Sequence, residues 1–203
     1  MNKLWISLVF FLIPGISGIV LAGDFEELTA SCESCHGPDG ASPYSDVPII
    51  GGQSTKYISD SLESFQIWGR PCVKSAYRSG DTSKPKTDMC KIAGGLSSED
   101  IQKLSEHYSS RPWVAAPQKF DASLAATGAA LHLQSCETCH QQGGSAAGVG
   151  PKLAGQWAPY LKHALKFVPT GEHAVPSTME RKLADFSAEE IDALLNYYAS
   201  QQN

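Results

Sequence analysis

Apolar residues recur at helical spacing in two segments of the chain that begin alike. In the later segment they stand at i, i+3, i+4 and i+7, which is one face of a helix, and they are Ile191, Leu194, Leu195 and Tyr198. Ser187 and Glu190, three residues apart, form the capping-box signature that starts such a helix. The earlier segment repeats this order, with Ser97 and Asp100 before Ile101, Leu104 and Tyr108. The pattern predicts two similar amphipathic helices.

Three further segments have the pattern of helices. Residues 57–65 and 160–167 are short and amphipathic. Asp121 stands where it could cap a helix that carries Leu124 and Leu131 on one face. No convincing run alternates polar and apolar residues, and proline, glycine and serine fill the segments between. The sequence therefore predicts an all-α fold with few strands and much loop.

The chain contains two copies of one unit. Cys32-Glu33-Ser34-Cys35-His36 recurs 104 residues later as Cys136-Glu137-Thr138-Cys139-His140. A Gly-Gln-x-x-x-Tyr segment follows in each copy, at 52–57 and at 155–160. The C-terminal parts of the copies are offset by only 90 residues, so the first copy carries 13 additional residues. A duplicated pair of domains is expected.

A chain of 203 residues has room for two such domains. We expect domain 1 over residues 23–110 and domain 2 over residues 122–203. The segment between them, 111–121, holds two prolines and is expected to be the linker.

Residues 1–22 have the layout of a secretory signal peptide. Lys3 provides a short positive start, an uncharged apolar run follows, and small side chains precede a cut after Ala22. In a bacterium this address is the periplasm, where disulfides persist. The alternative is a retained anchor, which Pro14 and Gly15 disfavour because they weaken a helix. Contact with a membrane is expected only if this segment is retained.

The charge balance excludes one class of partner. The chain holds 16 lysines and arginines against 21 aspartates and glutamates, a net charge of −5, and it has no basic run. Nucleic acid is therefore not expected as a partner. Loss of the signal peptide removes Lys3 and makes the balance more negative, which favours a basic surface on a protein partner.

The repeated Cys-x-x-Cys-His motif is the attachment motif for c-type haem. Two thiols one helical turn apart can add to two vinyl groups on one porphyrin edge, and the adjacent histidine can bind the iron. A thioredoxin-like redox pair would need a βαβ context, and a zinc site would need both pairs brought together across a domain boundary. The sequence predicts two covalently attached haem c groups, held by Cys32, Cys35, Cys136 and Cys139.

Met89 and Met179 occupy matched positions of the two copies, whereas Met1 belongs to the signal peptide. A thioether suits the sixth position of haem iron and raises its reduction potential. We expect His36 and Met89 to bind one iron, and His140 and Met179 the other. The alternative is a second histidine, but none recurs at a matched position among His107, His132, His163 and His173. With both axial positions filled, electron transfer is expected rather than substrate chemistry at iron.

Other residues of the sequence suggest supporting roles. A backbone carbonyl near Pro48 and one near Pro151 are expected to accept a hydrogen bond from the ligand histidines, the alternative being a plain turn. Cys72 and Cys90 are expected to form a disulfide that braces the lengthened segment, the alternative being a redox-active or sulfur-binding pair. Burial in a core or at the domain interface is expected for Trp68, Trp113 and Trp157.

These features together resemble the dihaem cytochrome c4 family. The likeness rests on two Cys-x-x-Cys-His units, each followed by a proline, a Gly-Gln-x-x-x-Tyr segment and a methionine-containing C-terminal region. It covers nearly all of the chain after the signal peptide. It implies two tandem class I cytochrome c domains related by a pseudo-twofold axis, with the haems facing each other. It also implies the ligand pairs His36 with Met89 and His140 with Met179.

Residues 120–202 are in addition similar to the cytochrome subunit of flavocytochrome c sulfide dehydrogenase. The likeness runs from Phe120-Asp121 through the second haem motif and Leu153-Ala-Gly-Gln-Trp157 to the C-terminus. In that family a flavoprotein subunit oxidises sulfide and passes electrons to the cytochrome. The resemblance implies a flavoprotein or another redox protein as partner, in a heterodimer. The first half, with Cys72 and Cys90, departs from this pattern.

The main hypothesis is a periplasmic dihaem cytochrome that transfers electrons, without being an enzyme itself, as the haem subunit of a sulfide-oxidising flavocytochrome c. The alternative is a free cytochrome c4 shuttle between a respiratory complex and a terminal oxidase. A subunit would show a sizeable apolar patch, and a shuttle a small one with a charged rim. A haem enzyme would need a labile sixth ligand, against which the paired methionines count, and haem storage has the least support.

Overall fold

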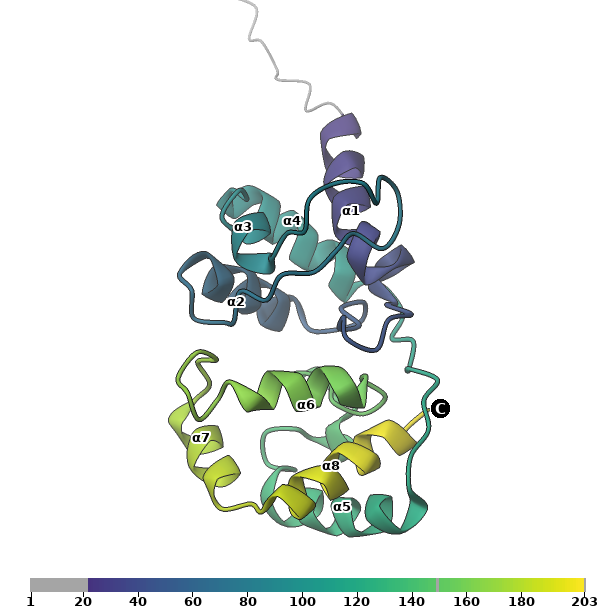
Figure 1. The fold of residues 1–203 in the computed structure, drawn as a ribbon, viewed down its shortest axis with the longest axis vertical. Coiled ribbons are helices and arrows are strands. Elements are labelled where there is room, and N and C mark those ends of the chain that lie inside the picture. The colour runs from purple at the N-terminus through teal and green to yellow at the C-terminus, as the bar shows by residue number, and fades with distance from the viewer. Residues whose placement is uncertain (1–21, 149, 203) are drawn as a thin grey trace, which may run out of the picture.

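The helices form two groups, one stacked on the other (Figure 1). The computed structural model describes residues 22–148 and 150–202, so the predicted signal peptide lies, but for its last residue, outside the described residues. The upper group consists of α1 (Ala22–His36), η1 (Pro38–Gly40), α2 (Thr55–Gln66), α3 (Met89–Ala93) and α4 (Ser98–Ser109). The lower group consists of α5 (Ala122–Ser135), η2 (Gln142–Gly144), α6 (Ala158–Lys166), α7 (Ser177–Ala184) and α8 (Ala188–Ser200).

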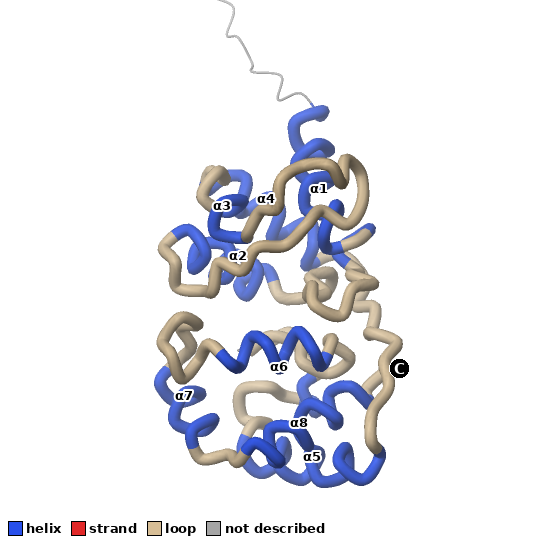
Figure 2. The backbone as a smooth tube through the Cα atoms, in the orientation of Figure 1, coloured by secondary structure: helices blue, strands red, loops and turns tan. Residues whose placement is uncertain are grey.

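The predicted all-α fold is confirmed. Figure 2 shows helices joined by long loops, and within the described ranges the β-structure is a single isolated bridge between Ser75 and Thr87. No helix among those described is long and apolar enough to cross a membrane.

The three helices with predicted caps begin where the sequence predicts, whereas α2 and α6 each begin two residues earlier than predicted and α1, α3 and α7 were not predicted. At α4 the Asp100 amide donates to Ser97 Oγ at 3.1 Å, and the Ser97 amide donates back to the Asp100 carboxylate at 2.9 Å. The same reciprocal bonds join Ser187 and Glu190 at the start of α8. Asp121 caps α5 by accepting from two amides of its first turn. These caps satisfy amides that a helix leaves without partners.

Each group has its own apolar core. The upper core consists of Ile58, Leu104 and Tyr108, and the lower core of Leu161, Leu194, Leu195 and Tyr198. In the lower group α5 and α8 pack closely at Gly128. A side chain could not fit there, since a Cβ would collide with the Ala193 carbonyl. The last helix of each group, α4 and α8, binds the repeated Gly-Gln segment of its own half. The Gly52 amide donates to the Tyr108 carbonyl and the Gly155 amide to the Tyr198 carbonyl, both at 2.8 Å.

Two glutamines join the groups by reciprocal hydrogen bonds. The Ile49 amide donates to Gln156 Oε1 at 3.0 Å, and Gln156 Nε2 donates to the Ile49 carbonyl at 2.9 Å. In the matched place the Lys152 amide donates to Gln53 Oε1 at 2.9 Å, and Gln53 Nε2 donates to the Lys152 carbonyl at 3.1 Å. Both glutamines come from the repeated Gly-Gln-x-x-x-Tyr segment, so this segment serves the contact between the two halves.

The tryptophans do not all behave as predicted. Trp157 is buried at the interface, where it packs with Ile49 and Ala116 and its Nε1 donates to the Ser42 carbonyl at 2.8 Å. Trp113 packs against the same cluster. The prediction for Trp68 is wrong, because its side chain is 73% exposed. Trp68 follows the end of α2 with a φ of 61°, and this left-handed turn directs its side chain into solvent.

Candidate haem sites

The first Cys-x-x-Cys-His unit lies at the C-terminal end of α1. Cys32 and Cys35 are one helical turn apart, so their thiols share a face of the helix, and His36 is the last helical residue. In the second unit Cys136 caps α5, and the amides of Cys139 and His140 donate to its carbonyl at 3.1 and 2.9 Å. This continues the turn beyond the helix. All four thiols are free of disulfides.

Each ligand histidine is held by the carbonyl of a proline. His36 Nδ1 lies 2.9 Å from the Pro48 carbonyl oxygen, and His140 Nδ1 lies 3.2 Å from that of Pro151. A carbonyl only accepts, so the proton is on Nδ1 and Nε2 keeps its lone pair. The predicted hydrogen bonds are confirmed. They fix the tautomer and orientation that a metal-binding imidazole needs.

Burial keeps both rings in the form that binds iron. His36 and His140 are 7% and 8% exposed, and burial lowers the pKa of each below its usual value. The imidazoles are therefore neutral at pH 7. Gly150 adds to the second site because its backbone lies directly against the His140 ring, where a Cβ would come within 2.5 Å of Cε1. These features fit a haem with an axial histidine.

The thiols fit covalent attachment better than redox or zinc chemistry. Burial raises the pKa of Cys32 to about 11 and also raises that of Cys136, so both thiols are protonated at neutral pH. An activated redox pair or a metal ligand would need a lowered pKa. The two pairs also lie in different halves of the molecule, which leaves the four sulfurs far from a common zinc site.

The glutamate inside each motif has a role that the sequence analysis missed. The Glu137 carboxylate accepts from the amides of Gln142 and Gly143, at 2.8 and 3.0 Å, and from His132 Nε2 at 2.8 Å. The bonds from Gly143 and His132 lower the pKa of Glu137. Glu33 similarly accepts from an amide of the following loop, at 3.0 Å. Glutamate occurs at the same position of both motifs, and this recurrence was the signal in the sequence that could have indicated its role.

Of the alternative histidine ligands, His132 has both ring nitrogens engaged in hydrogen bonds. His132 is 1% exposed, and its Nδ1 accepts from the Tyr198 hydroxyl at 2.9 Å while its Nε2 donates to Glu137. His132 therefore could not replace a methionine without losing one of these bonds. His173 Nδ1 donates to the Ala164 carbonyl at 3.0 Å, which leaves its Nε2 available, as in the two motif histidines.

Met89 and Met179 occupy matched elements. Met89 is the first residue of α3 and Met179 is the third of α7, and both side chains are half-buried. In Figure 1, α3 stands across the upper group from α1, which carries the first haem motif. The two methionines therefore hold matched places in the two halves, and their role as iron ligands stays a prediction.

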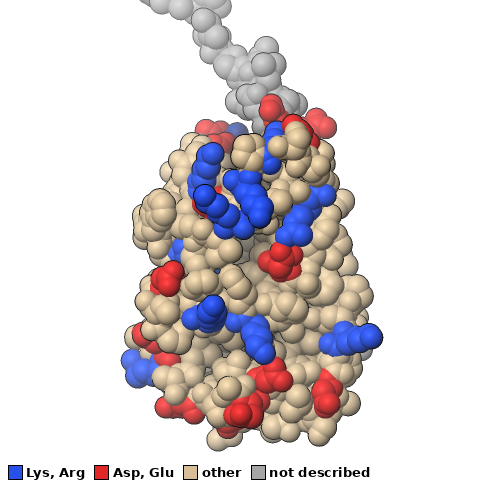
Figure 3. All heavy atoms as spheres, viewed as in Figure 1, with Lys and Arg blue, Asp and Glu red and all other residues tan. Residues whose placement is uncertain are grey.

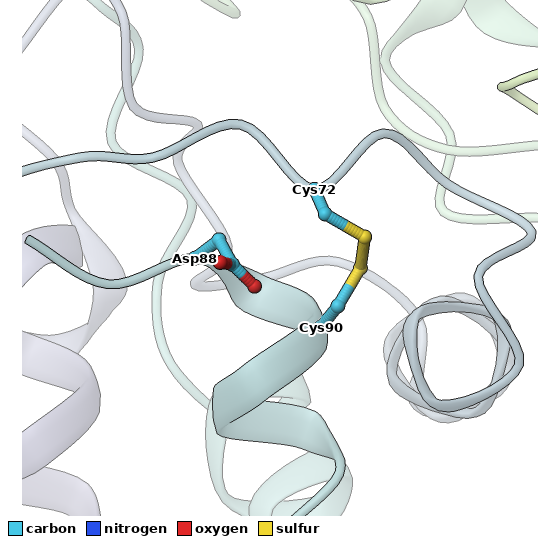
Figure 4. A group of neighbouring side chains, drawn as sticks. All are labelled: Cys72, Asp88 and Cys90. Atoms are coloured by element: carbon cyan, nitrogen blue, oxygen red, sulfur yellow. A yellow bond between two sulfur atoms is a disulfide. The ribbon is translucent and has the colours of Figure 1, made fainter.

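Cys72 and Cys90 form the disulfide that the sequence predicts. Figure 4 shows it beside Asp88, whose carboxylate caps α3 by accepting from the Lys91 amide at 2.9 Å. The two sulfurs are bonded to each other, so this cluster is not a metal site. Because Cys90 follows Met89, the disulfide ties the start of α3 to the lengthened segment.

The surface charge is distributed unevenly. Figure 3 shows lysine and arginine side chains gathered over the upper group. The segment between α2 and α3 contributes Lys74, Arg78, Lys84 and Lys86 and runs across this face (Figure 1); we refer to residues 74–86 as the basic segment. The negative net charge therefore does not describe this face.

The chain is similar to several known cytochromes. A family model described as "Cytochrome C oxidase, cbb3-type, subunit III" matches residues 123–197. Cytochrome c4 of Stutzerimonas stutzeri is 28% identical over 97% of this chain and 98% of its own length. Cytochrome c-554(548) of Halomonas halodenitrificans is 31% identical over 42% of this chain and 90% of its own length.

Similarity to a solved structure extends to the whole fold. The crystal structure of reduced cytochrome c4 from Pseudomonas stutzeri matches with a TM-score of 0.68 and 26% identity, over 89% of this chain and 98% of that one. The cytochrome subunit of sulfide dehydrogenase from Chlorobaculum tepidum is 32% identical, but over 41% of this chain and 62% of its own length. The likeness to cytochromes c4 is therefore the broader of the two.

Proposed function

Because the chain belongs to the cytochrome c4 family of dihaem c-type cytochromes, we propose how its residues hold and use the haems. It is an electron-transfer protein of two tandem class I cytochrome c domains, with two covalently bound haem c groups. We assign one haem to Cys32, Cys35 and His36 with Met89 as sixth ligand. The matched residues Cys136, Cys139 and His140, with Met179, bind the other.

The observation that carries this assignment is the repeated bond between histidine and proline carbonyl. It occurs in both halves, beside both Cys-x-x-Cys pairs, and leaves Nε2 of His36 and of His140 available. When bound, each haem supplies a one-electron couple between ferric and ferrous iron. The chain's part is to orient the imidazoles, keep them neutral and exclude water from them.

We also propose the domain boundaries and the cellular location of the protein. Domain 1 covers residues 23–110, domain 2 covers 122–203, and 111–121 links them, in keeping with helices that begin at α1 and α5. Residues 1–22 act as a signal peptide. Cytochrome c4 homologues are typically periplasmic in Gram-negative bacteria, which supports export of this chain to the periplasm.

Ligand binding tests the axial assignment. With both positions filled, the reduced protein should not bind carbon monoxide, whereas Met89→Ala and Met179→Ala should each bind one equivalent. Leu183→Ala is the matched control, because Leu183 is a half-buried apolar residue in the same helix as Met179. Binding by the unaltered protein would reveal a labile sixth position and contradict the assignment.

The protein works with redox partners, and two features of the upper group suggest how they dock. The basic segment would meet an acidic surface, which makes encounter rates fall as salt concentration rises. Beside it, exposed apolar side chains occur at Ile67, Trp68 and Val73. We propose a flavoprotein subunit of sulfide-oxidising type as the fixed partner, as the name of the Chlorobaculum tepidum relative suggests.

Affinity capture from the native periplasm tests this partner. Co-purification of a flavoprotein, with flavin absorbance in the eluate, is the expected result. A lone, monodisperse dihaem protein would contradict the fixed complex and favour a free cytochrome c4 shuttle between a respiratory complex and a terminal oxidase.

A further inference from the structure

Arg70 places a guanidinium where the two halves of the molecule meet. Its Nη1 donates to Ser61 Oγ at 2.7 Å and lies 3.5 Å from the Tyr57 hydroxyl, while its Nη2 lies 3.4 Å from the Tyr160 hydroxyl. Tyr57 and Tyr160 end the repeated Gly-Gln-x-x-x-Tyr segments of the two halves. One cation therefore joins two equivalent tyrosines across the interface.

This guanidinium lacks a carboxylate partner. Three arginines have a buried Nε without a hydrogen-bond partner, and two of them pair with an aspartate, Arg78 with Asp46 and Arg111 with Asp39. Within residues 22–148 and 150–202 no carboxylate forms an ion pair with Arg70. A guanidinium stays charged at every accessible pH, and a buried charge is costly unless it is paired. The rings of Tyr57 and Phe65 lie 5.8 and 5.1 Å from the guanidinium carbon, but no carboxylate offsets its charge, and its Nε has no hydrogen-bond partner to compete with an anion.

Arg70 and its neighbour Gly69 contact the segments that precede both methionines. Its carbonyl oxygen is 3.7 Å from Sγ of Cys72 and of Cys90, and Cys90 follows Met89. The carbonyl of the preceding residue, Gly69, accepts from the Ala174 amide at 2.8 Å, which connects it to the segment before α7 and Met179. The anion expected here would thus lie beside the proposed axial-ligand segments.

We propose that Arg70 is the interior counter-ion of haem propionate and raises the reduction potential of the haem with which it pairs. This inference rests on the proposed haem assignment. Each haem carries two propionate carboxylates, which are anions that the cofactor itself introduces. The planar guanidinium matches a carboxylate in a two-bond fork. Pairing offsets a negative charge that would otherwise stabilise ferric over ferrous iron.

Replacement of the charge tests the proposal in the holoprotein. Arg70→Gln should lower the equilibrium constant for reduction of at least one haem about tenfold, which is about 59 mV for one electron. It should also shift the propionate bending bands in the resonance Raman spectrum. Arg70→Lys keeps the charge but loses the fork, so it should shift the Raman bands with a smaller fall in potential. Lys56→Gln is the control, because it removes an exposed charge from α2.

The outcomes separate this proposal from the one on which it rests. If Arg70→Gln holds two haems and its reduction potentials and Raman bands equal those of Lys56→Gln, the proposed role of Arg70 is overturned and the haem assignment stands. Fewer than two haems in the unaltered protein would overturn the haem assignment instead. If Arg70→Gln does not fold, Arg70→Lys decides, and unaltered Raman bands there would overturn the proposal.

Discussion

Gln156 should contribute more to stability than any surface glutamine, because its amide satisfies buried groups of both halves. It is 2% exposed and makes three hydrogen bonds, accepting from the Ile49 and Trp157 amides and donating to the Ile49 carbonyl. Gln156→Ala would leave these three backbone groups buried without partners. An unsatisfied buried group costs about 1 to 3 kcal/mol, so with three such groups the free energy of unfolding should fall by at least about 3 kcal/mol.

Urea unfolding of the holoprotein, followed by circular dichroism, measures this loss. Gln102→Ala is the control, since Gln102 is exposed and bonds only to Glu106 within the same helix, and it should cost less than about 0.5 kcal/mol. Gln53→Ala should cost about 2 to 4 kcal/mol, because it orphans the Lys152 amide and carbonyl.

Gln156→Ala should also alter the environment of the first haem, although Gln156 belongs to the other half of the molecule. Ile49 follows Pro48, whose carbonyl orients His36, so freeing Ile49 should alter the spectrum of the haem bound by His36. If Gln156→Ala matches Gln102→Ala in stability and in spectrum, the reasoning that these bonds hold the halves and the histidine together is refuted.

Three other predictions concern the sites. Gly150→Ala should perturb one haem spectrum and lower stability by about 1 to 3 kcal/mol, because its Cβ meets the ligand ring, whereas Gly148→Ala, with open space around it, should not. A double change of Cys72 and Cys90 to serine should lower the free energy of unfolding by about 3 kcal/mol with both haems retained, as denaturant titration and haem stoichiometry can check. The pKa of Glu137 is lowered in the folded protein, so the stability that its carboxylate contributes should be complete above the ordinary pKa of about 4.3 and lost as the pH falls further. Urea midpoints measured between pH 7 and 3.5 should show this loss in the unaltered protein and a smaller loss in Glu137→Gln.

Local signals predicted α2, α4, α5, α6 and α8, because each signal acts over a few residues, but they did not predict α1, α3 and α7. The caps at Ser97, Asp121 and Ser187 form as their spacing requires, and the helices that follow them are those the apolar pattern predicts. The bonds from His36 to Pro48 and from the matched pair were also predictable, since the motif and the proline recur together.

Long-range partners could not be predicted in the same way. The repeat marked Gln53 and Gln156, but their partners lie 99 and 107 residues away, in the other half. No arginine stands at either offset from Arg70 in the second copy, so the repeat drew no attention to it. Trp68 was expected to be buried because it is apolar, whereas a left-handed turn after α2 sets its direction.

Near-infrared magnetic circular dichroism of the oxidised protein tests the central claim most directly, because its charge-transfer band reports both axial ligands of ferric haem. The account predicts histidine and methionine at both irons, with Met89→His and Met179→His each converting one haem to the bis-histidine form. A bis-histidine or high-spin signal in the unaltered protein would contradict it.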